Sequence, residues 1–229
     1  MRHFSSVFPI TFEVPGHLDE RGVPYGEAVD IIRQFAFELT NYEKPAGQHW
    51  GVATDFGSNE ASDQPEIVAM RVLVPKNSPP AWSNGPPVVF YDALEALVAV
   101  NIWCIRARMH GLIGSAGKSA YPSVYESVCY KPKVKGTEEL WDSIEALHQR
   151  GHGVCEDLAC ARVAERRIVG DPCRPNLISQ RMPDGILYHV TVQNPDGSNE
   201  DPSGELGMNL GKANDLTAPR CRLLLAKKA

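Results

Sequence analysis

Three short motifs in a fixed order constrain this chain of 229 residues more than any other feature. Cys155 follows a Gly-His-Gly loop and opens a predicted helix, His189 lies in a predicted strand, and Asp201 follows the turn after that strand. A thiol, an imidazole and a carboxylate are the three groups of a cysteine nucleophile system. The fold therefore has to accommodate a helix start, a strand and a turn that bring these three side chains together.

The position of Cys155 favours a reactive thiol. A cysteine where a glycine-bracketed loop meets a helix receives the positive end of the helix dipole and unpaired N–H groups, and both lower the thiol pKa. The same N–H groups can hold an oxyanion. Glu156 and Asp157 oppose thiolate formation by their charge, so a histidine has to contribute. The alternative is that Cys155 is a buried small hydrophobic residue, as isolated cysteines usually are.

A predicted hairpin connects the histidine to the carboxylate. Residues 194–197, Asn-Pro-Asp-Gly, have the composition of a tight turn, and strands are predicted at 177–180 and 186–193. If the turn closes a hairpin, His189 sits opposite Asp201 with Cβ atoms roughly 5 Å apart, and the carboxylate orients the imidazole. A slip of one residue would turn Asp201 to the other face. Taken singly, His189 can be an ordinary strand residue and Asp201 a turn cap.

The remainder of the chain is predicted to mix helices, strands and loops. We expect strands at 8–14 and 66–74 and helices at 26–41, 90–113, 137–148 and 155–169, with Thr137 as the N-cap of the helix over 137–148. The segments 47–64 and 75–87 are rich in Gly, Asn, Ser or Pro, which predicts loops.

Composition limits the partners and the compartment. With 28 acidic and 23 basic residues the net charge is −5, so no broad basic surface for nucleic acid is expected. Six cysteines are too sparse for a disulfide scaffold and fit a reduced compartment. Residues 1–9 lack the apolar stretch of a signal peptide, and the longest apolar run, 96–105, is too short for a membrane span. We therefore expect a cytoplasmic protein without a nucleic-acid or membrane partner.

The three motifs also resemble a known family. Gly-x-Cys-x-Asp-x-Ala at the start of a helix, an aromatic-His-Val strand and Asp-Pro-Ser are similar to the transglutaminase-like superfamily of papain-type cysteine enzymes, over about residues 137–208. Within it the chain most resembles short transglutaminase-like proteins of bacteriophages and prophages. In those, Gly-Asp-Cys-Glu-Asp-Leu-Ala, Tyr-His-Val, Pro-Asp-Gly and Glu-Asp-Pro-Ser with Leu-Gly-Met recur, and Val154 replaces the first acidic residue here.

The resemblance implies a role for each candidate residue. Cys155 would be the nucleophile, His189 the general base and acid, and Asp201 the group that orients the histidine. Papain-type enzymes often carry a glutamine shortly before the nucleophile as an oxyanion donor, which points to Gln149, although Gln149 can equally be a solvated helix end. Trp141 is expected in the core rather than in the site.

The resemblance also implies an α+β fold in which the nucleophile helix packs on an antiparallel sheet. This papain-like or transglutaminase-like core is expected over residues 116–229. An N-terminal α/β region without an assigned function is expected over residues 1–115, and the two regions can form one compact unit.

We therefore expect a thiol-dependent acyl-transfer enzyme, a cysteine peptidase or amidase that acts on protein or peptide substrates without a cofactor. Hydrolysis is favoured over cross-linking because nothing in the chain suggests an amine site. The alternative is a catalytically silent structural or assembly component of a phage particle, whose N-terminal region contacts phage structural proteins and whose loops at 47–64 and 75–87 can be partner-binding arms or lids. Such a protein is made in the cytoplasm of the bacterial host and can be incorporated in the virion. A third reading, a cysteine acetyltransferase, lacks a visible nucleotide-binding feature.

A metal site is not expected. His148, His152, Cys155, Cys160 and Cys173 offer ligand atoms, but their spacing crosses a helix end and a glycine break and fits no familiar zinc pattern. Such a site would also consume the nucleophile.

Overall fold

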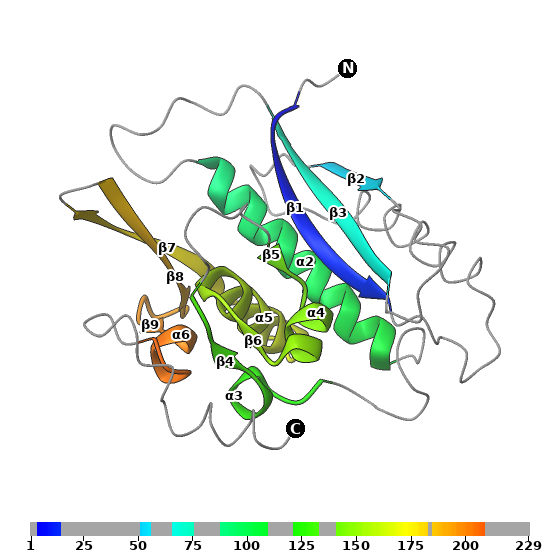
Figure 1. Ribbon diagram of the computed structural model, residues 1–229. Coiled ribbons are helices and arrows are strands. Elements are labelled where there is room, and N and C mark those ends of the chain that lie inside the picture. Colours follow the sequence, from blue (N-terminus) through cyan, green and yellow to red (C-terminus); the bar gives the residue numbers. More distant parts are fainter. Residues whose placement is uncertain are drawn as a thin grey trace.

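A computed structural model describes residues 4–14, 51–55, 66–75, 88–109, 121–132, 141–182 and 185–208 of the chain (Figure 1). Helices and strands are mixed along the described chain, so the predicted α+β class is confirmed. None of the helices in these ranges is both long enough and apolar enough to cross a membrane. The helix predicted at 26–41 lies outside the described residues.

The first sheet has the strand order β2-β3-β1-β5. Strand β1 (Phe4–Val14) pairs antiparallel with β3 (Glu66–Pro75), and both extend the strands predicted at 8–14 and 66–74. Strand β2 (Gly51–Asp55) pairs antiparallel with β3, so the loop predicted over 47–64 is wrong at this point. Its pairing partner supplies backbone hydrogen bonds that the local Gly-rich composition does not reveal. The predicted loop at 75–87 falls outside the described residues after Pro75.

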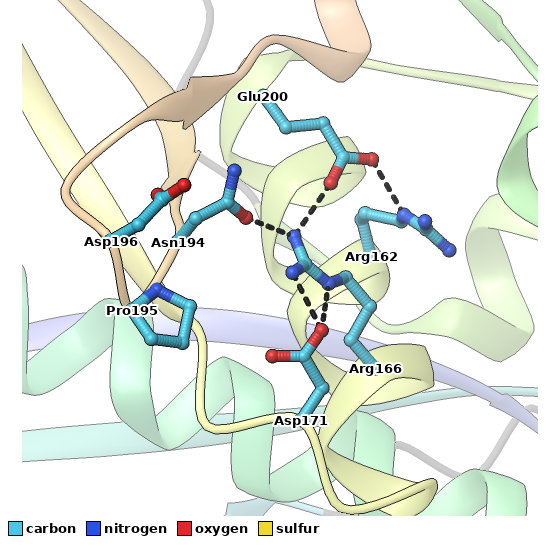
Figure 2. A pocket seen from close by; sticks show the side chains of 7 residues that line it. All are labelled: Arg162, Arg166, Asp171, Asn194, Pro195, Asp196 and Glu200. Atoms are coloured by element: carbon cyan, nitrogen blue, oxygen red, sulfur yellow. Dashed lines mark hydrogen bonds and ion pairs between the residues drawn. The ribbon is translucent and has the colours of Figure 1, made fainter.

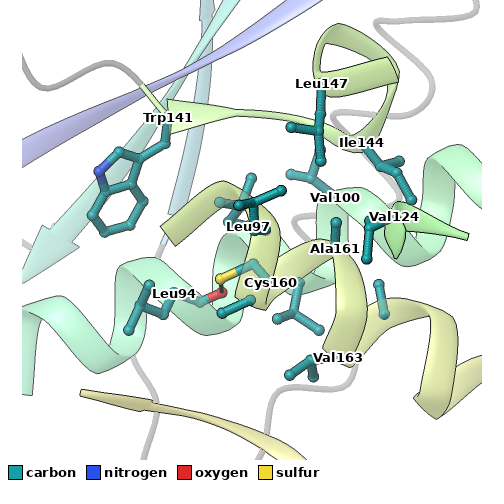
Figure 3. Packing of buried hydrophobic residues seen from close by; sticks show 14 of the residues in the cluster. Leu94, Leu97, Val100, Val124, Trp141, Ile144, Leu147, Cys160, Ala161 and Val163 are labelled. Carbon is teal, nitrogen blue, oxygen red and sulfur yellow. Dashed lines mark hydrogen bonds between the residues drawn. The ribbon is translucent and has the colours of Figure 1, made fainter. Parts of the chain in front are cut away.

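Helix α2 (Val88–Met109) supplies much of the core. All its residues from Asp92 to Ile102 are buried, as expected for a helix surrounded by other elements. It packs against α5 (Cys155–Ile168), and Figure 3 shows Leu94 and Leu97 of α2 close to Cys160 of α5, whose thiol donates to the Leu94 carbonyl at 3.5 Å. The predicted N-terminal and catalytic regions thus contribute to one buried cluster.

Helix α4 (Ile144–Arg150) begins later than predicted. Trp141 and Asp142, expected inside a helix over 137–148, form the short strand β5, which pairs parallel with β1. Trp141 is buried in the core, as expected, and Ser143 takes the N-cap role predicted for Thr137, a residue outside the described ranges. The long-range pairing with β1 overrides the local helical pattern.

Glycines fix the short path from α4 to α5. Gly151 ends α4 in the left-handed conformation, with φ 72°, which glycine adopts without strain. Strand β6 (His152–Gly153) follows and pairs with β4 (Cys129–Tyr130), which is preceded by α3 (Val124–Ser127). A Cβ on Gly153 would lie 2.4 Å from Leu147 Cδ1, so the loop can approach α4 only because this residue has no side chain.

The second large sheet has the order β7-β8-β9 and is antiparallel. Strands β7 (Arg174–Met182) and β8 (Gly185–Gln193) contain the predicted strands, and the predicted turn at 194–197 leads to β9 (Asn199–Glu200), with Gly197 at φ 86°. Helix α6 (Pro202–Glu205) follows. Helix α5 packs against β8, so the helix that carries Cys155 lies on the strand that carries His189.

Candidate active site

Cys155 is the first residue of α5, where the sequence predicted it. Val154, the N-cap, has no side-chain oxygen to accept hydrogen bonds from the first turn. The N–H groups at the start of an α-helix have no intrahelical partner. The start of α5 therefore offers donors and the positive end of a helix dipole beside the sulfur.

The thiol of Cys155 is neutral in its present contacts. It is 8% exposed, and its Sγ donates to Glu156 Oε2 at 3.2 Å. Burial and the charge of Glu156 raise the pKa of Cys155 well above its ordinary value, while a contact with the backbone N–H of Val190 acts in the opposite direction. The contact with Val190 places the sulfur beside β8, at the residue after His189. Because the thiol is protonated at neutral pH, a base has to remove its proton before it can attack.

His189 and Asp201 are brought together. The imidazole Nε2 lies 3.1 Å from Asp201 Oδ2, and His189 is 8% exposed. The separation is that of an ion pair, but the direction is outside hydrogen-bond geometry, and both ring nitrogens are buried without a hydrogen-bond partner among the described residues. No hydrogen bond in the described part of the chain joins the imidazole to the Cys155 thiol, and Nδ1 has no other hydrogen-bond partner there.

The route to this contact differs from the predicted one. Pairing His189 directly with Asp201 would place Val192 opposite Ser198, whereas Val192 pairs with Glu200. The register is displaced by an even number of residues, so the same side chains share a face. Strand β9 ends at Glu200, and Asp201 reaches the imidazole because the chain turns there into α6.

The two oxygens of Asp201 have different partners. Oδ1 accepts from the backbone N–H of Gly204 at 3.0 Å and caps α6, while Oδ2 faces the imidazole. The residue is therefore both the turn cap and the histidine partner, which the sequence offered as alternatives. A Cβ on Gly204 would lie only 2.8 Å from Asp201 Oδ2.

We predict that Gly204→Ala lowers the rate at which Cys155 reacts with a peptide electrophile by about tenfold, because small displacements of catalytic groups are costly. The added methyl group pushes the carboxylate oxygen that faces His189, and a flexible side chain can yield with little loss of stability. Labelling read by mass spectrometry and a thermal melt measure the two effects. Glu205→Ala, an exposed change in the same helix, is the control, and equal rates in both variants would contradict the prediction.

Glu200, the residue before Asp201 in the sequence, connects β9 to α5 through ion pairs. Figure 2 shows Arg166 between Glu200, Asn194 and Asp171, with Arg162 on the other carboxylate oxygen of Glu200. Glu200 Oε1 lies 2.7 Å from Arg162 Nε, and Glu200 Oε2 lies 2.7 Å from Arg166 Nη1. Burial raises the pKa of Glu200, but hydrogen bonds from Tyr125 and Arg162 outweigh burial and lower this pKa below its ordinary value. This ionised network fixes the backbone that presents Asp201.

The same side chains line a cavity of about 610 Å³, which contains none of the three candidate catalytic residues. Its lining residues are Arg162, Arg166, Asp171, Asn194, Pro195, Asp196 and Glu200. The two arginines in this lining already pair with Glu200 and Asp171.

Asp157 fixes the loop that presents the nucleophile. Its carboxylate is buried and accepts from the backbone N–H of Asp142 at 2.8 Å and of Val154 at 3.1 Å. Burial and the charge of Asp142 raise its pKa well above the ordinary value. Asp157 thus links β5 to the residue before Cys155, and its role is structural.

We predict that Asp157→Ala lowers the free energy of unfolding by about 3 kcal/mol, because it leaves two buried N–H groups without acceptors. Asp157→Asn, the matched variant, keeps one side-chain oxygen as a hydrogen-bond acceptor, so its free energy of unfolding should fall by less. Because the folded-state pKa is raised, ionisation of Asp157 destabilises the fold as pH rises above the ordinary aspartate range, so the Asn variant gains relative to wild type as pH rises. Denaturant unfolding at several pH values tests the loss of stability and its pH dependence. If the stability difference between Asp157→Asn and wild type stayed the same at every pH, the predicted pH dependence would be wrong.

The resemblance implied that Gln149 is an oxyanion donor, and its observed contact is with Glu145 instead. It is exposed near the end of α4, and its amide donates to Glu145 Oε1 at 3.4 Å. The alternative, a solvated helix end, describes it better. The backbone donors at the start of α5 remain as the candidate oxyanion site.

Tyr130 was not singled out by the sequence. It lies in β4, paired with Gly153, and burial together with the charges of Cys155 and Glu156 raises its pKa to about 12. The tyrosine therefore lies near the thiol. No motif around it signals this position, because the parallel pairing of β4 with β6 brings it there.

The residues considered as metal ligands have other contacts. The His148 ring bonds Ser127 Oγ at 2.8 Å through Nδ1 and stacks on Tyr121, and Cys160 faces α2. Within the described ranges, no three His, Cys, Asp or Glu side chains form a group able to hold a metal ion.

No family model, no curated protein and no solved structure matches this chain.

Proposed function

We propose that this protein is a thiol-dependent acyl-transfer enzyme with a transglutaminase-like core, a cysteine peptidase or amidase that uses Cys155, His189 and Asp201. The observation that carries the proposal is the 3.1 Å approach of the His189 imidazole to Asp201, on the strand against which the Cys155 sulfur lies. A carboxylate that holds an imidazole beside a thiol at a helix start is the arrangement that nucleophile activation requires.

The reaction begins with a neutral thiol. His189 Nδ1 takes the thiol proton as the sulfur forms a bond to the carbonyl carbon of an amide or ester. The carbonyl oxygen becomes an oxyanion, which the N–H groups at the start of α5 stabilise. When the intermediate collapses, the imidazolium protonates the leaving amine, and a thioester remains on Cys155.

Water completes the cycle. His189 takes a proton from the water, whose oxygen attacks the thioester, and the sulfur leaves and regains its proton from the imidazolium. Asp201 keeps the ring oriented and stabilises its charged form in both halves. We propose hydrolysis rather than cross-linking because nothing in the chain or in the described site suggests a place for an acceptor amine.

The test is activity-based profiling with a library of peptide electrophiles, read by mass spectrometry. The reaction is expected at Cys155, with Cys104, Cys129, Cys160 and Cys173 as buried internal controls. Labelling spread over these cysteines, or none at Cys155, would contradict the proposal.

One observation favours the alternative of a catalytically silent structural or assembly component, for instance in a phage particle. Cys155 is almost fully buried, and its thiol donates to Glu156, with no hydrogen bond to the imidazole among the described residues. The alternative predicts that Cys155 reacts with peptide electrophiles no faster than the other buried cysteines.

A further inference from the structure

Glu156 directly follows the nucleophile and contacts it. Its side chain is half-buried, and Oε2 accepts from Cys155 Sγ at 3.2 Å. Among the described residues this thiol is its one hydrogen-bond partner, and no cationic side chain pairs with it. Two other carboxylates pair with arginines: Asp142 with Arg150, and Glu200 with Arg162 and Arg166.

This uncompensated charge acts on the groups around the sulfur. After burial, Glu156 is the largest cause of the raised pKa of Cys155, and it also contributes to the raised pKa of Tyr130. A carboxylate beside a thiol disfavours the thiolate because like charges repel. In its present contact Glu156 therefore accepts the hydrogen of the thiol and keeps the nucleophile protonated.

We propose that Glu156 is a specificity-determining residue that selects substrates with a cationic group next to the reacting carbonyl, and that pairing with this group releases the thiol to His189. The inference rests on the proposed function. A lysine or arginine side chain of a peptide, or its free amino group, supplies this chemistry.

The geometry gives the cation two effects. It occupies the carboxylate that now accepts the thiol proton, and it cancels the negative charge that opposes ionisation of the sulfur. The freed thiol then transfers its proton to His189 Nδ1 in the proposed mechanism, and this nitrogen is buried without a hydrogen-bond partner in the described part of the chain. A substrate without the cation would meet a thiol still held by Glu156.

Charged thiol reagents of similar size test the inference without a substrate. In each, the Cys155 thiolate attacks the sulfenyl sulfur of an alkyl methanethiosulfonate, a mixed disulfide forms and methanesulfinate leaves. Wild type is expected to react at least about tenfold faster with the ammonium reagent than with the sulfonate reagent, measured at Cys155 by mass spectrometry. The preference should fall as salt is added, because salt screens the attraction.

Glu156→Gln keeps the shape and removes the charge. It is expected to lose most of the preference for the cationic reagent and to react about tenfold faster than wild type with neutral methyl methanethiosulfonate, because the negative charge that disfavours the thiolate is gone. Glu126→Gln, an exposed change on α3, should behave as wild type. An unchanged preference in Glu156→Gln, or a wild-type preference insensitive to salt, overturns the inference.

Peptide amides then separate the two proposals. Two peptides are compared that carry lysine or norleucine next to the scissile bond. Wild type should hydrolyse the lysine peptide faster, whereas Glu156→Gln should hydrolyse both at similar rates. Charge selectivity at Cys155 without turnover of any peptide would refute the proposed function and leave the role of Glu156 standing. Turnover with equal rates for both peptides would refute the role of Glu156 and leave the proposed function standing.

Discussion

Cys155→Ala is expected to reduce peptide hydrolysis by at least about 10⁴-fold, the largest effect of any single change. The substitution removes the atom that bonds to the carbonyl carbon, while the helix start and the imidazole remain. Loss of a nucleophile in comparable systems costs this much or more, because the remaining groups only bind and polarise the substrate. Turnover of the best peptide from the profiling library is the measurement.

Cys160→Ala is the matched control, since Cys160 is a buried thiol of the same helix and packs on α2. It should lose some stability but little activity per folded molecule. Activity retained in Cys155→Ala, with a normal thermal melt, would contradict the assignment of the nucleophile.

His189→Gln is expected to lower the same turnover by about 10²- to 10⁴-fold, the range in which a positioned acid–base group contributes. Glutamine keeps a polar side chain near Asp201 but cannot take a proton from the thiol. The requirement is strong here because burial and the charge of Glu156 raise the pKa of Cys155 and so disfavour the thiolate.

A thermal melt has to show that His189→Gln is folded, and steady-state kinetics has to separate kcat from KM. The decrease is expected in kcat, because His189 transfers protons rather than binding substrate. A variant that keeps kcat and only raises KM would assign His189 to substrate binding instead.

The elements around the candidate site could largely be predicted from the sequence. The glycines before Cys155, the helical pattern after it and the Asn-Pro-Asp-Gly turn act locally, and each produced the expected element. The approach of His189 to Asp201 was predicted from direct pairing of the two residues across a hairpin, whereas Asp201 lies after β9, at the start of α6. The Asp-Pro dipeptide at a helix start carries a local signal for α6, because proline is favoured at the first helical position.

The errors occur where distant segments meet. Trp141 and Asp142 have a helical pattern but pair with β1, and Gly51–Asp55 has a loop composition but pairs with β3. The resting contact of the thiol with Glu156, and the nearness of Tyr130, also depend on packing between elements. No local pattern contains this information.

The activation of Cys155 by His189 can be measured without a substrate as the rate at which iodoacetamide alkylates Cys155 at pH 7 in wild type and in His189→Gln. This small neutral reagent needs no substrate site, so its rate reports how well the imidazole removes the thiol proton. If His189 activates Cys155, the wild-type sulfur reacts at least about tenfold faster than that of the folded variant. Equal rates would show that His189 does not activate Cys155.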